Sequence, residues 1–174
     1  MPCKPPPPPP FTVTVDTREQ LPWALAISER GKRLEIPTVR GTLTEGDYQL
    51  VGHRVAIERK SLADAVGTAF GSTVLADGSK GLAWDRFRRE LERVREAKMD
   101  RFWIFIEASR GDVFGHRYHS GVDPKSVLGR WDSIVVDHGI PVLWCGSREE
   151  AQRMAAWFFK RWVEGFERAS KSTG

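Results

Sequence analysis

Two short segments carry residues that could do chemistry together. Asp47 begins one expected β-strand, and Glu58 and Lys60 lie in the next. Because strand side chains alternate between faces, Glu58 and Lys60 point the same way and Arg59 points oppositely. Gly52 predicts a turn that folds Asp47 back beside Glu58. Two carboxylates and a lysine at one point suit metal-assisted phosphodiester cleavage. The acids bind a hard divalent cation, and the lysine orients or deprotonates a water or stabilises developing charge.

A second acidic cluster favours this catalytic interpretation over a surface hairpin with ordinary charges. The hairpin alternative exists because Glu-x-Lys also occurs as an exposed ion pair that contributes little to stability. Asp16 and Glu19 come directly after the alternating strand 11–15, with Arg18 between them. Carboxylates at strand ends are typical ligands and are seldom core residues. We therefore expect Asp16 and Glu19 to complete the acidic pocket, directly or through water.

Together these segments resemble the nuclease domain of the XPF-type structure-specific DNA nucleases. That family carries a Val-Asp-x-Arg-Glu segment and a Gly-Asp-Tyr…Glu-Arg-Lys-Ser…Asp signature. The matching residues here are Val15, Asp16, Arg18, Glu19, Gly46, Asp47, Tyr48, Glu58, Arg59, Lys60, Ser61 and Asp64. Glu-Arg-Lys alone is a weak match, but the ordered set is specific. The resemblance continues through residues 102–107 and 133–142, so it covers most of the chain from about Phe11 onwards.

The resemblance implies a restriction-endonuclease-like α/β/α sandwich with a mixed central sheet. It implies a Mg²⁺- or Mn²⁺-dependent endonuclease of DNA repair and recombination, acting on flap, fork or other branched or single-strand-containing DNA. The catalytic residues that it implies are Asp16, Glu19, Asp47, Glu58 and Lys60, with the metal bound by Asp47, Glu58 and Asp16. Arg86 matches the family's arginine near the site and is expected to hold a phosphate. Arg18 and Arg59 are expected to fix the DNA backbone, a role that reads no bases.

Two other functions stay open at this point. A non-catalytic DNA-binding partner subunit on the same fold is one alternative, although such relatives typically lose the acids of the signature and none is lost here. A nuclease directed at RNA is the other. Many enzymes of the family also carry a tandem helix-hairpin-helix module after the nuclease domain, and none follows Trp162 here. We therefore expect a protein partner or a second copy of the chain to supply additional contacts with DNA.

A homodimer is also expected, as the family's nuclease domains commonly form one. The last expected helix carries Trp157, Phe158, Phe159 and Trp162, and four large aromatic residues within six positions cannot all face one core. A monomer with a deeply buried last helix is the alternative.

Composition agrees with this interpretation without proving it. A length of 174 residues allows one domain with a proper core, and a formal charge of +4 suits an anionic partner. The sequence has no apolar run long enough to span a membrane, and its N-terminus lacks a signal-peptide hydrophobic region. With only Cys3 and Cys145, a stabilising disulfide is not expected. We expect an intracellular protein, cytoplasmic if prokaryotic or viral and nuclear if eukaryotic.

The chain divides into a proline-rich leader at 1–10, the nuclease domain at 11–168 and a frayed tail at 169–174. The leader is expected to be an extended polyproline II rod, as a spacer or as a docking segment for a partner. Expected strands cover residues 11–15, 34–39, 48–51, 54–59, 102–106 and 142–144. Expected helices cover 23–29, 61–66, 83–98 and 124–139, and a last one opens at Ser147.

Two further segments could have a functional role. The glycine-rich insertion at 71–81 predicts a mobile loop beside the active site, which either closes on DNA or is a tolerated surface insertion. His116 and His119 suggest zinc, but no cysteine or third histidine is nearby and Arg117 between them would repel a cation. A metal role there is not expected.

Overall fold

Short runs rich in β-branched and aromatic residues form a six-stranded central sheet. The computed structural model describes residues 11–29, 31–74 and 78–172. In spatial order the strands are β10 (Val142–Trp144), β9 (Arg101–Ile106), β6 (Val55–Lys60), β5 (Tyr48–Leu50), β1 (Val13–Asp16) and β4 (Thr38–Gly41). β1 is parallel to β4, and β9 is parallel to β6 and β10, whereas β5 is antiparallel to both β1 and β6. The predicted mixed sheet is confirmed.

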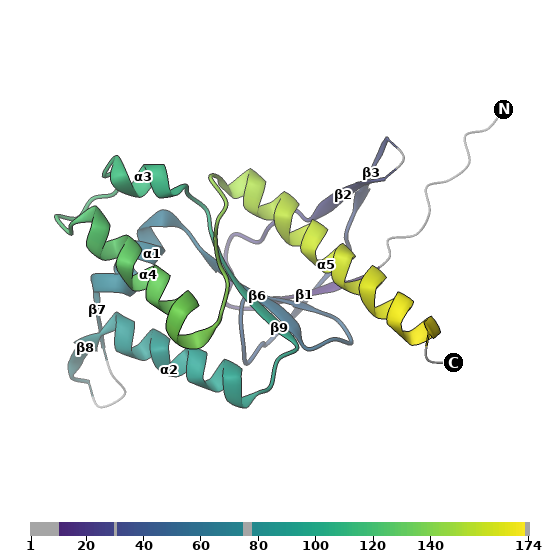
Figure 1. The fold of residues 1–174 in the computed structure, drawn as a ribbon, viewed down its shortest axis with the longest axis horizontal. Coiled ribbons are helices and arrows are strands. Elements are labelled where there is room, and N and C mark those ends of the chain that lie inside the picture. Colours follow the sequence, from purple (N-terminus) through teal and green to yellow (C-terminus); the bar gives the residue numbers. More distant parts are fainter. Residues whose placement is uncertain (1–10, 30, 75–77, 173–174) are drawn as a thin grey trace.

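Helices cover both faces of the sheet (Figure 1). One face packs against α1 (Leu62–Phe70), α2 (Ala83–Glu96), the short α3 (Arg110–Phe114) and α4 (Pro124–His138). The other face packs against α5 (Arg148–Ser172) and a hairpin of β2 (Ala26–Glu29) and β3 (Lys32–Glu35). The expected α/β/α sandwich is therefore confirmed. No described helix is both long enough and apolar enough to cross a membrane.

The central strands are buried on both faces because their alternate side chains enter different cores. In β9, Phe105 belongs to the core under α5, while Ile104 and Ile106 belong to the core under α1, α2 and α4. In β6, Ile57 and Ala56 divide in the same way. Parallel strands covered on both faces have this nearly continuous apolar sequence. Both cores thus fix β6, the strand whose end carries Glu58 and Lys60.

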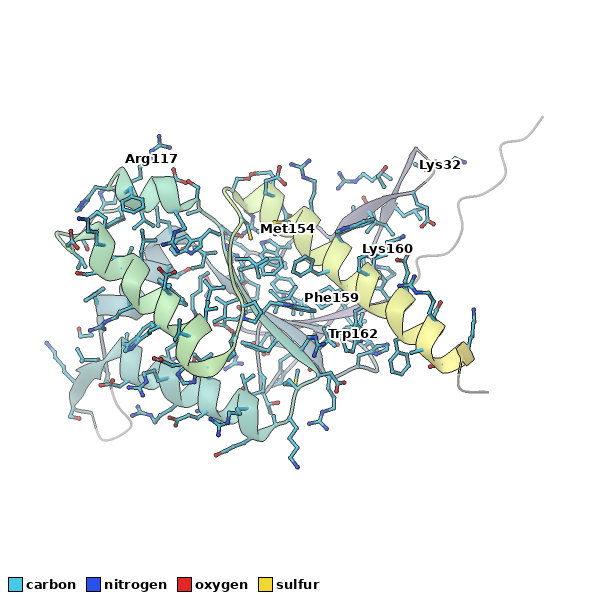
Figure 2. The ribbon with its side chains drawn as sticks, viewed as in Figure 1. Lys32, Arg117, Met154, Phe159, Lys160 and Trp162 are labelled. Atoms are coloured by element: carbon cyan, nitrogen blue, oxygen red, sulfur yellow. The ribbon has the colours of Figure 1, made fainter. Side chains whose placement is uncertain are left out.

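The aromatic residues of α5 divide between core and solvent. Phe159 is fully buried, Phe158 and Trp162 are partly buried against the same core, and Trp157 is 51% exposed. Figure 2 shows Phe159 and Trp162 on the side of α5 that faces the sheet. Lys160 lies with its Nζ 5.4 Å from the Trp157 ring. Three of the four aromatic side chains are thus used by the core of one chain, and the homodimer stays a prediction.

The prediction of a helix at 23–29 is wrong, because residues 26–29 of this segment form β2. Leu25 and Ile27 are buried and alternate with more exposed neighbours, which is the period of a strand. Ile27 lies opposite Leu34 in the β2–β3 hairpin. Gly31, with a φ of +75°, supplies the left-handed conformation of the turn.

Several other boundaries differ from the expectations. The 71–81 insertion is not a plain loop, because β7 (Ser72–Val74) pairs with β8 (Lys80–Leu82), and residues 75–77 are outside the described part. α5 continues to Ser172, so the tail expected at 169–174 is largely helical. The proline-rich leader lies outside the described residues. α3 was not predicted, although its capping box of Ser109 and Asp112 could have indicated it.

The fold predicts that two phenylalanines contribute very differently to the free energy of unfolding. Phe105 is fully buried and contacts Trp23 and Phe158, whereas Phe114 is 58% exposed. Phe105→Ala should lower the free energy of unfolding by about 3–5 kcal/mol, because it leaves a cavity between sheet and α5. Phe114→Ala, the matched control, should change it by less than about 0.5 kcal/mol. Urea denaturation measures both values, and equal losses would contradict the described core.

Candidate active site

The backbone brings the predicted acids together at one edge of the sheet. Asp47 lies just before β5, where its N–H donates to Ile57 O at 2.9 Å and its C=O accepts from Asp16 N–H at 2.9 Å. Asp47 therefore lies between the last residue of β1 and the end of β6. Its carboxylate Oδ2 accepts the backbone N–H of Arg59 at 2.8 Å. The turn predicted at Gly52, with a φ of +77°, is confirmed and returns the chain to this point.

Glu58 and Lys60 point to the same side of β6, as their spacing predicted. The Lys60 Nζ lies 2.6 Å from Glu58 Oε1, and the two side chains are 13% and 16% exposed. Burial alone would lower the pKa of Lys60, but the Glu58 and Asp47 carboxylates outweigh it and raise that pKa. The ammonium therefore stays charged. A charged Lys60 suits orientation and charge stabilisation better than proton abstraction.

Asp47 and Glu58 form a like-charged carboxylate pair. Burial, with the charge of Glu58 as a second cause, raises the pKa of Asp47 to about 7, although the N–H of Arg59 and the charge of Lys60 act against this. From the residues that the structure describes, neither Asp47 Oδ1 nor Glu58 Oε2 accepts a hydrogen bond. Each carboxylate thus keeps one oxygen without a protein donor.

This donor set fits a hard divalent cation. Mg²⁺ prefers oxygen ligands and commonly keeps several waters beside one or two carboxylates. Within residues 11–29, 31–74 and 78–172, no group of three or more acidic, histidine or cysteine side chains is placed to hold a metal. A cation between Asp47 and Glu58 would therefore complete its coordination with water and substrate oxygens. It would also neutralise the repulsion that raises the pKa of Asp47.

Asp16 is placed differently from the other acids. Its side chain is 1% exposed, and its Oδ1 accepts from the backbone N–H and the Nε of Arg18 at 2.8 and 2.7 Å. Its Oδ2 accepts from Arg18 Nη2 at 3.1 Å and from the N–H of Leu43 at 2.8 Å. Asp16 therefore fastens the end of β1 to residue 43. Its role as a metal ligand stays a prediction, and that role would require it to release these donors.

Arg59 joins two further carboxylates on the opposite side of β6. Its Nε and Nη2 donate to the two oxygens of Glu107 at 2.8 and 2.9 Å, and its Nη1 donates to both oxygens of Glu19 at 3.0–3.1 Å. The hydrogen bonds that Arg59 donates to Glu107 are the first cause of its raised pKa. The Arg59 side chain is 14% exposed and forms all of these bonds, so in this structure it links Glu19 to Glu107. Its predicted contact with DNA is untested.

Glu107 is a functional-site residue that sequence reasoning missed. It follows β9 directly, and its N–H donates to Lys60 O at 2.8 Å. Its Oε1 also accepts from Trp23 Nε1 at 2.6 Å and from Arg148 Nη1 at 3.2 Å. Burial would raise the pKa of Glu107, but the hydrogen bonds from Arg59 and Trp23 lower it. The sequence shows Glu107 as an acid at the end of an expected buried strand, but it does not show that this strand pairs with β6.

The start of α5 is fastened to the loop that carries Glu19. Arg148 Nη2 donates to Leu21 O at 2.6 Å and to Pro22 O at 3.2 Å. Glu19 Oε1 accepts the backbone N–H of Leu21 at 2.8 Å. The position of Glu19 thus depends on contacts from α5 as well as from Arg59.

A cleft of about 850 Å³ gathers most of the predicted site residues. Of these, Arg18, Glu19, Asp47, Glu58, Arg59, Lys60 and Arg86 line it, whereas Asp16 does not. Arg86 is 63% exposed, and its Nε lies 3.1 Å from Glu90 Oε1. Ser72 and Thr73 of β7 also line the cleft, so the 71–81 insertion does lie beside the site. His116 and His119 do not line it.

The Asp16–Arg18 contact predicts a specific loss of stability in acid. Hydrogen bonds from the Arg18 side chain lower the pKa of Asp16 to about 2, against the opposing effect of burial. A lowered pKa contributes stability above about pH 4 that is lost as the pH falls towards 2. Asp16→Asn should therefore cost on the order of 1–2 kcal/mol at pH 7, and the difference from wild type should shrink below pH 4.

Urea denaturation of wild type and variant at a series of pH values measures this difference. Both proteins share every other titrating carboxylate, so the comparison isolates Asp16. A difference that is constant from pH 7 to pH 2.5 would contradict the assignment.

Comparisons with known proteins agree with this geometry. The ERCC4 domain family model matches residues 15–158. XPF from Aeropyrum pernix is similar in structure, with a TM-score of 0.56 and 18% identity over 85% of this chain and 64% of that one. The same protein in complex with DNA gives a TM-score of 0.56 and 16% identity over 91% and 66%. The chain thus spans slightly less than two thirds of those chains. No curated protein matches it significantly in sequence.

Proposed function

The chain belongs to the ERCC4-domain family as an XPF-type nuclease domain, and we propose that it is a metal-dependent endonuclease acting on branched or partly single-stranded DNA. The observation that carries the proposal is the carboxylate pair of Asp47 and Glu58 beside the charged Lys60. Each carboxylate has one oxygen to which no described residue donates, and all three side chains line one cleft. A surface ion pair would explain neither the raised pKa of Asp47 nor the shared cleft.

Asp47 and Glu58 would hold Mg²⁺ or Mn²⁺. Bound there, such an ion supplies Lewis acidity, which polarises the phosphodiester and lowers the pKa of a bound water. The Lys60 ammonium stabilises the negative charge that develops on the phosphate as the P–O bond breaks. Arg86 of α2, which lines the cleft with its side chain 63% exposed, holds a neighbouring phosphate. Asp16 and Glu19 would complete the acidic pocket, although both accept hydrogen bonds from arginines, which Asp16 would have to release to bind the metal.

The depth of the site supports a preference for flexible DNA. The Glu58 and Lys60 side chains are only 16% and 13% exposed. A stiff duplex must be deformed to bring a phosphate to such a recessed point, whereas a junction or single strand bends at lower cost. One structure with a similar fold is XPF from Aeropyrum pernix in complex with DNA, which supports DNA as the ligand class. Flaps, forks and related branched DNA are therefore the proposed substrates.

The proposal predicts that the two carboxylates are needed for cutting but not for binding. Asp47→Asn and Glu58→Gln should each lower the single-turnover cleavage rate of labelled flap or fork DNA by at least about a hundredfold, because each removes a metal ligand. DNA affinity in EDTA should change little, since cationic side chains make the phosphate contacts. Glu149→Gln, an exposed acid of α5, is the charge-matched control.

Flap, fork, duplex and RNA substrates with Mg²⁺ and with EDTA separate the remaining alternatives. Metal-dependent cutting of branched DNA supports the proposal, and preferred cutting of RNA would replace it with an RNA-directed nuclease. Binding without cutting by the wild type would favour a non-catalytic partner subunit. Wild-type rates in both carboxylate variants would place the site elsewhere.

We further propose a homodimer through the exposed side of α5. Trp157 is 51% exposed there. Large aromatic side chains are enriched at protein interfaces. Trp157→Glu should shift the mass measured by light scattering from dimer to monomer at micromolar concentration. Val136→Glu, at an 82% exposed position of α4, should leave the mass unchanged. A monomeric wild type would contradict the dimer.

A further inference from the structure

A second hollow, of about 370 Å³, lies next to the catalytic cleft. Val66 and Phe70 of α1 line it from one side, and the segment 117–122 that follows α3 lines it from the other. Ala63, Gly67 and Gly71 line both this groove and the cleft. The two hollows therefore adjoin along α1.

The ridge between cleft and groove is low. Ala63, Gly67 and Gly71 follow one another at intervals of four residues, so they lie along one stripe of α1 and its C-terminal cap. A Cβ atom added at Gly67 would meet nothing within 4 Å, which leaves open space above the helix. A polynucleotide backbone could cross α1 here without displacing a side chain.

The groove offers aromatic rings that are already held in place. The Tyr118 hydroxyl donates to Val122 O at 2.7 Å, and its ring stacks on His116 with centroids 4.4 Å apart. The Phe70 ring packs against the Arg130 guanidinium, whose carbon lies 4.1 Å from the ring centroid. Rings fixed in this way lose little freedom when a flat ligand packs beside them. Val66 and Val122 add apolar surface.

The charge at the edge of the groove suits a nucleic acid. Arg117 lines the groove with its side chain 75% exposed, and it forms an ion pair with Asp112 at 2.9 Å. Figure 2 shows Arg117 projecting from the α3 end of the molecule towards solvent. A phosphate that follows a base into the groove would meet this cation.

We propose that the groove binds one unpaired base of the substrate strand, close to the phosphate that is cut. The inference rests on the proposed nuclease function and names the substrate feature that the site selects. A base within a duplex can turn into a lateral groove only by losing its pairing and stacking, whereas an unpaired base avoids most of that cost. Stacking of bases on aromatic side chains is sequence-tolerant and accounts for selection of structure without selection of sequence.

The test is a fluorescence titration with wild-type protein in EDTA, which prevents cutting. Fork DNAs carry 2-aminopurine, a base whose fluorescence falls on stacking, at successive positions of the unpaired strand beside the junction. We expect quenching at one or two positions only. Tyr118→Ala and the groove-filling Val122→Trp should abolish that quenching and weaken fork binding about tenfold. Tyr118→Phe, which keeps the ring, should retain both, and thermal unfolding checks that each variant is folded.

The outcomes separate this inference from the proposed function. Quenching that is uniform along the strand, or unchanged in both disruptive variants, would overturn the groove assignment even if the protein cuts forks. Equal weakening for blunt duplex and fork DNA would overturn it as well. Position-specific quenching without any cutting in Mg²⁺ would uphold the groove and overturn the nuclease function. If both disruptive variants keep the quenching but lose the capture of an apolar peptide, the groove binds a protein instead.

Discussion

The closeness of Asp47 and Glu58 is the constraint on which the rest of the site depends. Two carboxylates that approach one another out of water repel, and the raised pKa of Asp47 expresses that repulsion together with burial. The pairing of Asp47 with Ile57 and Asp16 through the backbone prevents the two acids from moving apart. The Lys60 ammonium offsets part of the repulsion. A divalent cation would offset the remainder, and this is the physical basis for proposing a metal at these two residues.

Successive side chains of β6 have different roles in the site. Glu58 and Lys60 form an ion pair on one side of β6, whereas Arg59, which also lines the cleft, joins Glu19 to Glu107. Through Glu107 the same network reaches Arg148 at the start of α5. Breaking a buried ion pair by removing one partner is strongly destabilising because it leaves an unpaired charge. The supporting residues therefore stabilise the fold and fix the direction of β6, and with it the acids that face the cleft.

Much of the site could be predicted because it depends on local geometry. The two-residue period brings Glu58 and Lys60 together, and the glycine turn returns Asp47 to them. The capping box of Ser61 and Asp64 likewise needs only the sequence. By contrast, the clamp of Arg59 on Glu107 depends on the parallel pairing of β6 and β9, a contact between residues 48 positions apart. The strand at 26–29 was missed for the same reason, since its partner strand and its core contacts decide it.

The most direct test of the central claim is calorimetric titration of the wild type with Mn²⁺ at pH 7, in two buffers that differ in ionisation enthalpy. If Asp47 and Glu58 hold the metal, one ion binds per chain and a fraction of a proton is released, because Asp47 with a pKa of about 7 is partly protonated before binding. Asp47→Asn should then bind far more weakly and release no proton. Binding of equal strength and proton release in wild type and variant, or no binding by the folded wild type, would contradict the account.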